Sequence, residues 1–91
     1  MKRVYMIISG KVQGVFYRDF ARKEAEKYGI VGFVRNLHDG TVEVLAEGDD
    51  DKLKRFILEC KRGPLLAFIK DAKITEQQPN PGEYEDFSIR Y

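Results

Sequence analysis

A turn signal near the middle of the chain limits the possible folds more than any other feature. Asp39-Gly40 separates two segments, 30–37 and 41–47, that have the length and the apolar content of β-strands. A tight two-residue turn needs positive φ angles, which glycine adopts without strain. We therefore predict that these two segments pair as an antiparallel β-hairpin.

One strand and one helix are predicted before the hairpin. The apolar run 4–9 is rich in β-forming residues and indicates a central strand. A helix over about 18–28 follows, because apolar residues recur along one helical face at steps of four, four and three: Tyr17, Ala21, Ala25 and Tyr28. Gly29 supplies the signal for its C-terminal end.

A second helix and two more strands are predicted after the hairpin. Apolar residues at i, i+3, i+4 and i+7 indicate the helix: Leu53, Phe56, Ile57 and Cys60. The acidic run 49–51 suits its N-terminus as a cap, and Gly63-Pro64 marks its end. Residues 65–74 are predicted to form a fourth strand and residues 84–91 a short last strand.

The predicted order of elements is β-α-β-β-α-β-β. Two right-handed strand-helix-strand units joined by a hairpin form a split βαβ sandwich, which is the ferredoxin-like α+β fold. We expect an antiparallel sheet, two helices on one of its faces and a short extra C-terminal strand. Residues 1–91 have the size of a single domain, and no repeat or linker divides them.

The balance of charges argues against one class of function. Lys and Arg total 16 against 15 Asp and Glu, so the formal net charge is +1 and there is no broad footprint for a nucleic-acid partner. The single cysteine, Cys60, excludes an intrachain disulfide and fits a reducing compartment. The N-terminal apolar run is too short for a membrane segment. We expect a cytoplasmic protein, a monomer or weak oligomer, without a membrane partner.

The segment 9–18 joins the first strand to the first helix and has the composition of an anion-binding loop. A helix N-terminus attracts anions through its free N–H groups and its dipole. Gly10 and Gly14 allow the backbone to curl so that successive N–H groups face one point. Arg18 adds a planar guanidinium that can hold two phosphate oxygens. An ordinary glycine-containing turn with a surface arginine fits the same residues, and composition leaves both interpretations open.

Asn36 is a polar amide in an otherwise apolar stretch of strand, where asparagine is unfavourable. In the predicted topology strands one and two run parallel with strand three between them, so both end at the same edge of the sheet. Asn36 would then approach the loop 9–18, where its amide is able to hold a water or a substrate oxygen. The alternative is a hydrogen bond that only prepares the following turn.

The other reactive residues are expected to have ordinary structural places. His38 should face solvent in the turn, and Cys60 should be a core residue. The acidic run 49–51 lacks the spacing of a calcium loop, so we predict no metal site. A non-catalytic phosphate- or RNA-binding module is the alternative to an enzyme. An RNA-binding sheet of this topology needs stacking aromatics on its central strands, where only Tyr5 occurs.

Two stretches closely resemble the signatures of the acylphosphatase family. The first is Gly10-Lys11-Val12-Gln13-Gly14-Val15-Phe16-Tyr17-Arg18, and the second is Gly32-Phe33-Val34-Arg35-Asn36, followed by Gly40-Thr41-Val42 and Gly48. The closing segment 87–91 is similar to the family too, so the resemblance covers residues 1–91 as a single acylphosphatase-like domain. Tyr17 is a small departure, because the family more often has Phe there, and we expect its hydroxyl to matter little.

The resemblance implies hydrolysis of acyl phosphates, which are carboxyl–phosphate mixed anhydrides, to a carboxylate and inorganic phosphate. It implies that Arg18 binds the phosphate, that Asn36 positions the attacking water, and that no metal or organic cofactor takes part. The implied phosphate-binding loop consists of Gln13, Gly14, Val15, Phe16, Tyr17 and Arg18. The expected partners are a small-molecule acyl phosphate and inorganic phosphate.

Overall fold

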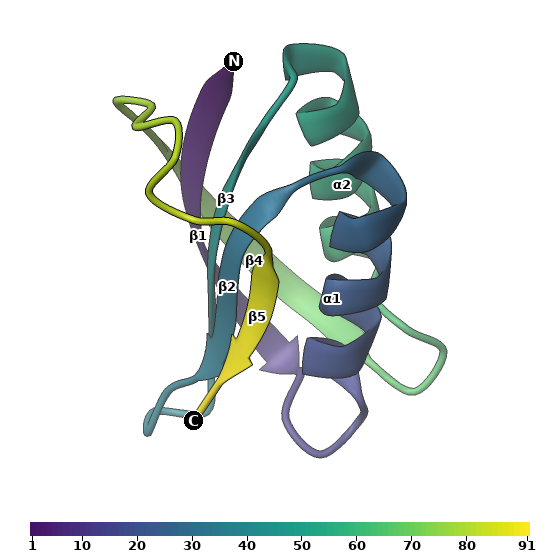
Figure 1. Cartoon of the computed structure of the whole chain (residues 1–91). Coiled ribbons are helices and arrows are strands. Elements are labelled where there is room, and N and C mark those ends of the chain that lie inside the picture. Colours follow the sequence, from purple (N-terminus) through teal and green to yellow (C-terminus); the bar gives the residue numbers. More distant parts are fainter.

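The structure, a computed structural model that describes residues 1–91, contains one five-stranded sheet with two helices on one of its faces (Figure 1). The strands are β1 (Lys2–Lys11), β2 (Val31–Asn36), β3 (Val42–Gly48), β4 (Phe68–Gln77) and β5 (Phe87–Arg90), and the helices are α1 (Tyr17–Tyr28) and α2 (Asp50–Arg62). This order and the two layers confirm the predicted ferredoxin-like α+β fold. Neither helix has the length and the apolar character needed to cross a membrane.

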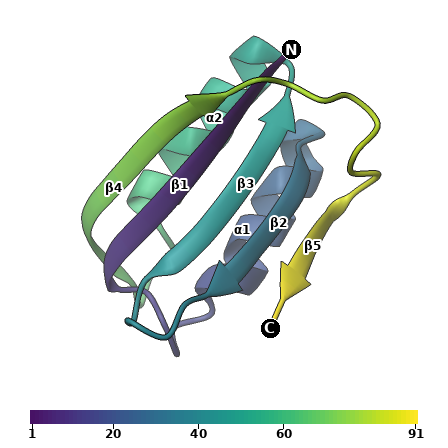
Figure 2. The same cartoon turned by 90° about the vertical axis from the view of Figure 1, so that its left-hand side faces the viewer.

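The strands lie in the order β4-β1-β3-β2-β5, which Figure 2 shows from the face that the helices leave open. β3 pairs antiparallel with both β1 and β2, and β4 pairs antiparallel with β1. β5 pairs parallel with β2, so the sheet is mixed and not wholly antiparallel. The predicted hairpin is confirmed, because Asn36 pairs with Val42 across the turn that contains Gly40.

The core lies between the sheet and the helices. Alternate residues of a strand point to the same face, and Met6, Ile8 and Val44 are completely buried beneath the helices. α1 turns Ala21 and Ala25 towards this layer, as its periodicity predicted. α2 contributes Leu53, Phe56 and Cys60. Each large aliphatic or aromatic side chain buried here stabilises the fold by about 1.5–3 kcal/mol.

Cys60 and His38 lie where the sequence predicted. The Cys60 side chain is fully buried, and this burial raises the pKa of its thiol, which disfavours the reactive thiolate. His38 is exposed in the turn after β2. Asp49 occupies the N-cap position of α2, but its side chain makes no capping hydrogen bond. The acidic first turn therefore stabilises α2 through the helix dipole.

The fourth strand begins later than the predicted range 65–74. A turn closed by a 3.0 Å hydrogen bond from Ala67 N–H to the Pro64 carbonyl keeps the first residues of that range out of the sheet. Leu65 is consequently 97% exposed despite its apolar side chain. The strand then continues past residue 74, because the first residues of β1 provide pairing partners as far as Gln77.

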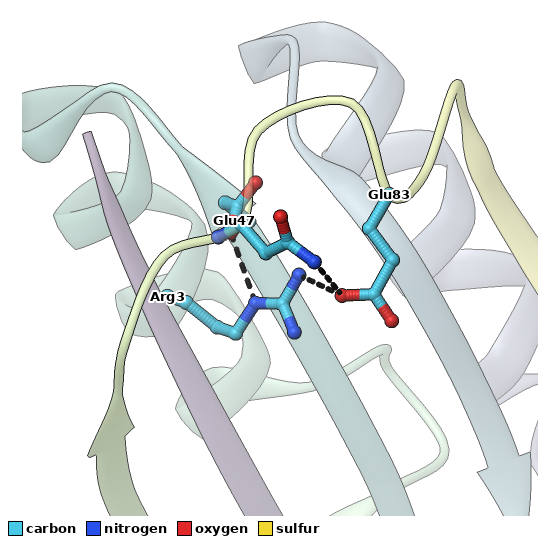
Figure 3. A network of polar contacts seen from close by, with 4 residues as sticks. Arg3, Glu47 and Glu83 are labelled. Carbon is cyan, nitrogen blue, oxygen red and sulfur yellow. Dashed lines mark hydrogen bonds and ion pairs between the residues drawn. The ribbon is translucent and has the colours of Figure 1, made fainter.

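A buried ion pair holds the loop 78–86 against the sheet before β5 begins (Figure 3). Arg3 Nε donates to Glu47 Oε1 at 2.9 Å, and Arg3 Nη2 donates to Glu83 Oε1 at 2.7 Å. The Asn80 N–H also donates to Glu47 Oε1, at 2.8 Å. The side chains of Arg3 and Glu47 are only 8% and 2% exposed. Because these contacts fix the loop, the last strand starts later than the sequence predicted.

Replacing Glu47 by Leu should destabilise the protein by about 3 kcal/mol, because the buried Arg3 Nε and the Asn80 N–H both lose their acceptor and Arg3 keeps only the partly exposed Glu83. The matched control is Glu76→Leu, since this carboxylate is 68% exposed and lies 3.8 Å from Lys2 Nζ. An exposed pair of that kind contributes at most about 1 kcal/mol. Urea denaturation of both variants measures the difference, and equal losses would contradict the role of the buried pair.

Candidate active site

Three segments that are far apart in the sequence meet at one end of the sheet. They are the loop 12–16 after β1, the end of β2 and the end of β5, all at the lower end of the molecule in Figure 1. A cleft with a volume of about 430 Å³ opens there. It is lined by Val12, Gly14, Phe16, Tyr17, Arg18, Asp19, Asn36, Ile89 and Tyr91. The structure therefore brings the loop, Arg18 and Asn36 to one cleft.

The two glycines of the first signature have different tasks. Gly10 still belongs to β1, and a Cβ at this position would lie 2.1 Å from the Phe68 carbonyl oxygen of β4. Gly10 is therefore required by the contact between strands, and not by the curl of the loop as predicted. Gly14 has a φ of 74°, and a Cβ there would meet nothing within 4 Å. Its backbone conformation, and not crowding, is what favours glycine.

Phe16 ends the loop in a left-handed conformation, which the sequence did not predict. It is the N-cap residue of α1, with φ 64° and ψ 26°, and its side chain makes no capping hydrogen bond. The residue is 75% exposed, so packing of the ring does not explain the conformation. A bulky residue in this region costs about 1–2 kcal/mol. With Gly14, this residue curls the backbone in the manner of an anion-binding nest.

The backbone N–H groups of this curl are free donors. Gly14, Val15 and Phe16 lie outside every helix and strand, and none of their N–H groups donates to a backbone carbonyl. The N–H groups of Tyr17 and Arg18 belong to the first turn of α1, where a helix offers no acceptor. Consecutive free donors at the positive end of a helix dipole form a site for an anion.

Arg18 adds a charge that no neighbouring carboxylate neutralises. Its guanidinium carbon lies 4.8 Å from the centre of the Tyr91 ring, and Arg18 takes part in no salt bridge. The adjacent carboxylate of Asp19 is engaged by Lys23 at 3.1 Å and by Arg22 at 3.0 Å. These two cations also hold the pKa of Asp19 below its ordinary value. The positive charge of Arg18 is therefore available to a ligand.

Asn36 reaches the cleft from the end of β2. It lies two residues after the buried Val34 and so shares the face of the sheet that the helices cover. Its Oδ1 is buried and has no hydrogen-bond partner in the chain. A second cleft of about 650 Å³ adjoins the first, and Arg18 and Asn36 border both. The exposed His38 lines only this second cleft.

The side chains of the remaining residues of the predicted loop make contacts elsewhere in the protein, although Tyr17 also lines the first cleft and Gln13 the second. Val15 is buried in the core, and the Gln13 side chain bonds to the hairpin between β2 and β3. The Tyr17 hydroxyl donates to the Cys60 carbonyl at 2.6 Å, and burial raises the pKa of Tyr17. This carbonyl has no helical donor, because the residue four positions later is Pro64. The Tyr17 hydroxyl therefore has a structural partner in α2, which was not predicted from the sequence.

The predicted site residues did not include four residues that line the cleft: Val12 and Asp19, on either side of the predicted loop, and Ile89 and Tyr91 at the other end of the sequence. Parallel pairing of β5 with β2 places Ile89 opposite Val34 and so brings the end of the chain beside Asn36. The only earlier signal was the similarity of the closing segment to the family. No group of three or more His, Cys, Asp or Glu side chains in the structure is arranged to hold a metal ion.

The open face of the sheet bears on the alternative of an RNA-binding module. Tyr5 is the only aromatic residue of the two central strands, and its hydroxyl donates to the Glu43 carboxylate. This hydrogen bond, together with burial, raises the pKa of Tyr5 to about 12. Arg35 pairs with the same carboxylate at 2.8 Å. Tyr5 and Arg35 of this face are therefore engaged within the protein.

Two variants of Phe16 separate its backbone strain from the loss of its ring. Both Phe16→Gly and Phe16→Ala remove the phenyl group, but only glycine adopts the left-handed conformation without strain. We expect the Gly variant to be more stable than the Ala variant by about 1 kcal/mol, which corresponds to a melting temperature about 4–8 °C higher. Thermal unfolding measures the order, and a more stable Ala variant would contradict the left-handed turn.

Comparison with known proteins shows the family to which this chain is similar over its length. A sequence profile of the acylphosphatase family matches residues 4–89. The acylphosphatase of Methylococcus capsulatus is 42% identical over 89 residues, which are 98% of this chain and 96% of the relative. The acylphosphatase of Thermotoga petrophila is 41% identical over 91 residues, with 100% and 99% covered. The crystal structure of acylphosphatase from Bacillus subtilis has a TM-score of 0.95 and 38% identity over 100% of both chains. The chain therefore belongs to the acylphosphatase family of enzymes, which act on acyl phosphates.

Proposed function

We propose that the cleft binds the phosphate group of an acyl phosphate and that a water held by Asn36 attacks the phosphorus. The observation that supports this proposal is the meeting of three unpartnered groups at one cleft. These are the free N–H groups of residues 14–18, the unpaired guanidinium of Arg18 and the buried Oδ1 of Asn36. Membership of the family supplies the class of reaction. The geometry suggests that the loop and Arg18 bind the phosphate and that Asn36 positions the water.

Binding depends on donors that are already in place. The N–H groups of the loop and the helix dipole of α1 face the negative oxygens of the phosphate without further reorganisation. Arg18 adds charge-assisted hydrogen bonds that are stronger than those of neutral donors. Its stacking on the Tyr91 ring orients the guanidinium and leaves its N–H edge for the ligand.

The bond to be broken requires little help from the protein. Water oxygen forms a bond to phosphorus, and the bond from phosphorus to the acyl oxygen breaks with its electron pair on the departing carboxylate. A carboxylate leaves without protonation, because the pKa of its conjugate acid is only about 4. Both protons of the water end on the released phosphate, one of them after transfer to a phosphate oxygen. No strong general base in the protein is needed for this route.

Asn36 aims the nucleophile in this scheme. Its amide offers one donor and one acceptor end, and the acceptor Oδ1 has no partner in the chain. A neutral amide adds little to the attraction of a dianion, so its contribution belongs to the orientation of the water in the transition state. In-line attack places this water opposite the leaving carboxylate, and both clefts that Arg18 and Asn36 border offer space for the two groups.

Two substitutions test the division of work. Arg18→Gln should lower the turnover of benzoyl phosphate by about a thousandfold and also weaken inhibition by phosphate. Asn36→Ala should lower kcat by roughly a hundredfold or more while KM and the phosphate inhibition constant stay within a few fold. Full activity of Arg18→Gln would remove the central claim, and a raised KM with unchanged kcat in Asn36→Ala would make Asn36 a binding residue. Thermal melts confirm that each variant is folded at the assay temperature.

Inorganic phosphate tests the anion site formed by the free N–H groups of residues 14–18. Chelators test the absence of a metal. Phosphate presents the same oxygens as the substrate to the same N–H groups, so it should inhibit competitively in steady-state assays. EDTA should leave the rate unchanged, because the proposed chemistry uses only backbone donors, Arg18 and Asn36. Loss of activity in EDTA and its recovery with Mg²⁺ would instead show that the metal-free mechanism is wrong.

A further inference from the structure

The side chain of Gln13 joins the phosphate loop to the hairpin that carries Asn36. Its single Nε2 lies 2.8 Å from the Leu37 carbonyl oxygen and 2.8 Å from the Thr41 carbonyl oxygen. These carbonyls belong to the two arms of the hairpin, on opposite sides of the turn. No other hydrogen bond in the structure connects the loop 12–16 with the residues from Asn36 to the start of β3.

The hairpin has its own bonds, but they fix only its internal shape. Leu37 N–H donates to the Thr41 carbonyl at 2.9 Å, and Asp39 accepts hydrogen bonds from the Thr41 N–H and hydroxyl. None of these contacts relates the hairpin to the loop that precedes α1. Gln13 alone supplies that relation through hydrogen bonds, one residue away from Asn36 along the chain.

The chemistry of the junction calls for a primary amide of this length. The Leu37 and Thr41 carbonyl oxygens each accept one N–H from the same side chain. The NH₂ group of a primary amide has two N–H donors and carries no charge. Glutamate would place a carboxylate against two carbonyl oxygens, which repel it. Methionine has the same length but donates no hydrogen bond, so it separates the bonds from the bulk of the side chain.

We infer that Gln13 is a positioning residue. It fixes the position of Asn36 relative to the phosphate-binding N–H groups of the loop, and it acts on the chemical step through Asn36. This inference rests on the role proposed for Asn36. A misplacement of about 1 Å at a reacting group can lower a rate by about a hundredfold. Loss of the two bonds frees the hairpin to move relative to Arg18, while the N–H donors of the loop remain.

The test is a double-mutant cycle of Gln13→Met and Asn36→Ala with benzoyl phosphate as the substrate. In the wild-type background, Gln13→Met should lower kcat about tenfold to a hundredfold and leave KM and the phosphate inhibition constant within about threefold. In the Asn36→Ala background the same substitution should change kcat less than about twofold. The control Gln78→Met, in the exposed loop after β4, should leave all three quantities unchanged.

Unchanged kcat in a folded Gln13→Met protein overturns the inference, and so does an equal loss of kcat in both backgrounds. Full activity of Asn36→Ala is a separate outcome, which overturns the proposed role of Asn36 and with it the route through Asn36. A thermal melt accompanies each assay. If Gln13→Met is unfolded, Gln13→His replaces it in the cycle. This variant retains one N–H donor, so an intermediate, Asn36-dependent loss is expected, and an Asn36-independent loss overturns the inference.

Discussion

The position of β3 between β1 and β2 is the constraint on which the candidate site depends. Antiparallel pairing on both of its edges forces β1 and β2 to run in the same direction and to end at the same edge of the sheet. Val42 pairs with Ile8 on one side and with Asn36 on the other. With strands about 4.8 Å apart, Asn36 lies roughly 10 Å across the sheet from the strand that leads into the loop. Backbone hydrogen bonds of the sheet therefore set the separation between Asn36 and the strand that leads into the loop.

At that edge the protein keeps features that would be unfavourable elsewhere in a folded chain. Phe16 has a strained backbone, consecutive N–H groups have no partner, and Arg18 has no counter-ion. The strained backbone of Phe16 lowers the stability of the unliganded state, and an anion in the cleft would give the N–H groups and Arg18 a partner. The neighbouring acid Asp19 is tied to Lys23 and Arg22, so it does not occupy the place of that anion.

Local patterns in the sequence predicted the order of elements, the hairpin and the approach of Asn36 to the loop. They were sufficient because periodicity and turn chemistry act over short stretches and the topology then fixes which strand ends meet. The left-handed conformation of Phe16 is unfavourable for a bulky residue, and it occurs at the N-cap position where the chain enters α1. The bonds of Gln13 join residues that are 24 and 28 positions apart, and the pairing of β5 depends on the loop fixed by Arg3. Such contacts leave no periodic mark in the sequence.

The buried pair of Arg3 and Glu47 has a consequence for the behaviour of the protein on heating. Charged groups are hydrated less favourably as the temperature rises, so the cost of removing this pair from water falls, while the hydrophobic contribution of the core levels off. The pair and Glu83 hold the loop that leads into β5, and β5 brings Ile89 and Tyr91 to the cleft. The segment that carries Ile89 and Tyr91 is thus held by an ion pair whose share of the stability rises with temperature. On heating, this side of the cleft should be among the last to unfold.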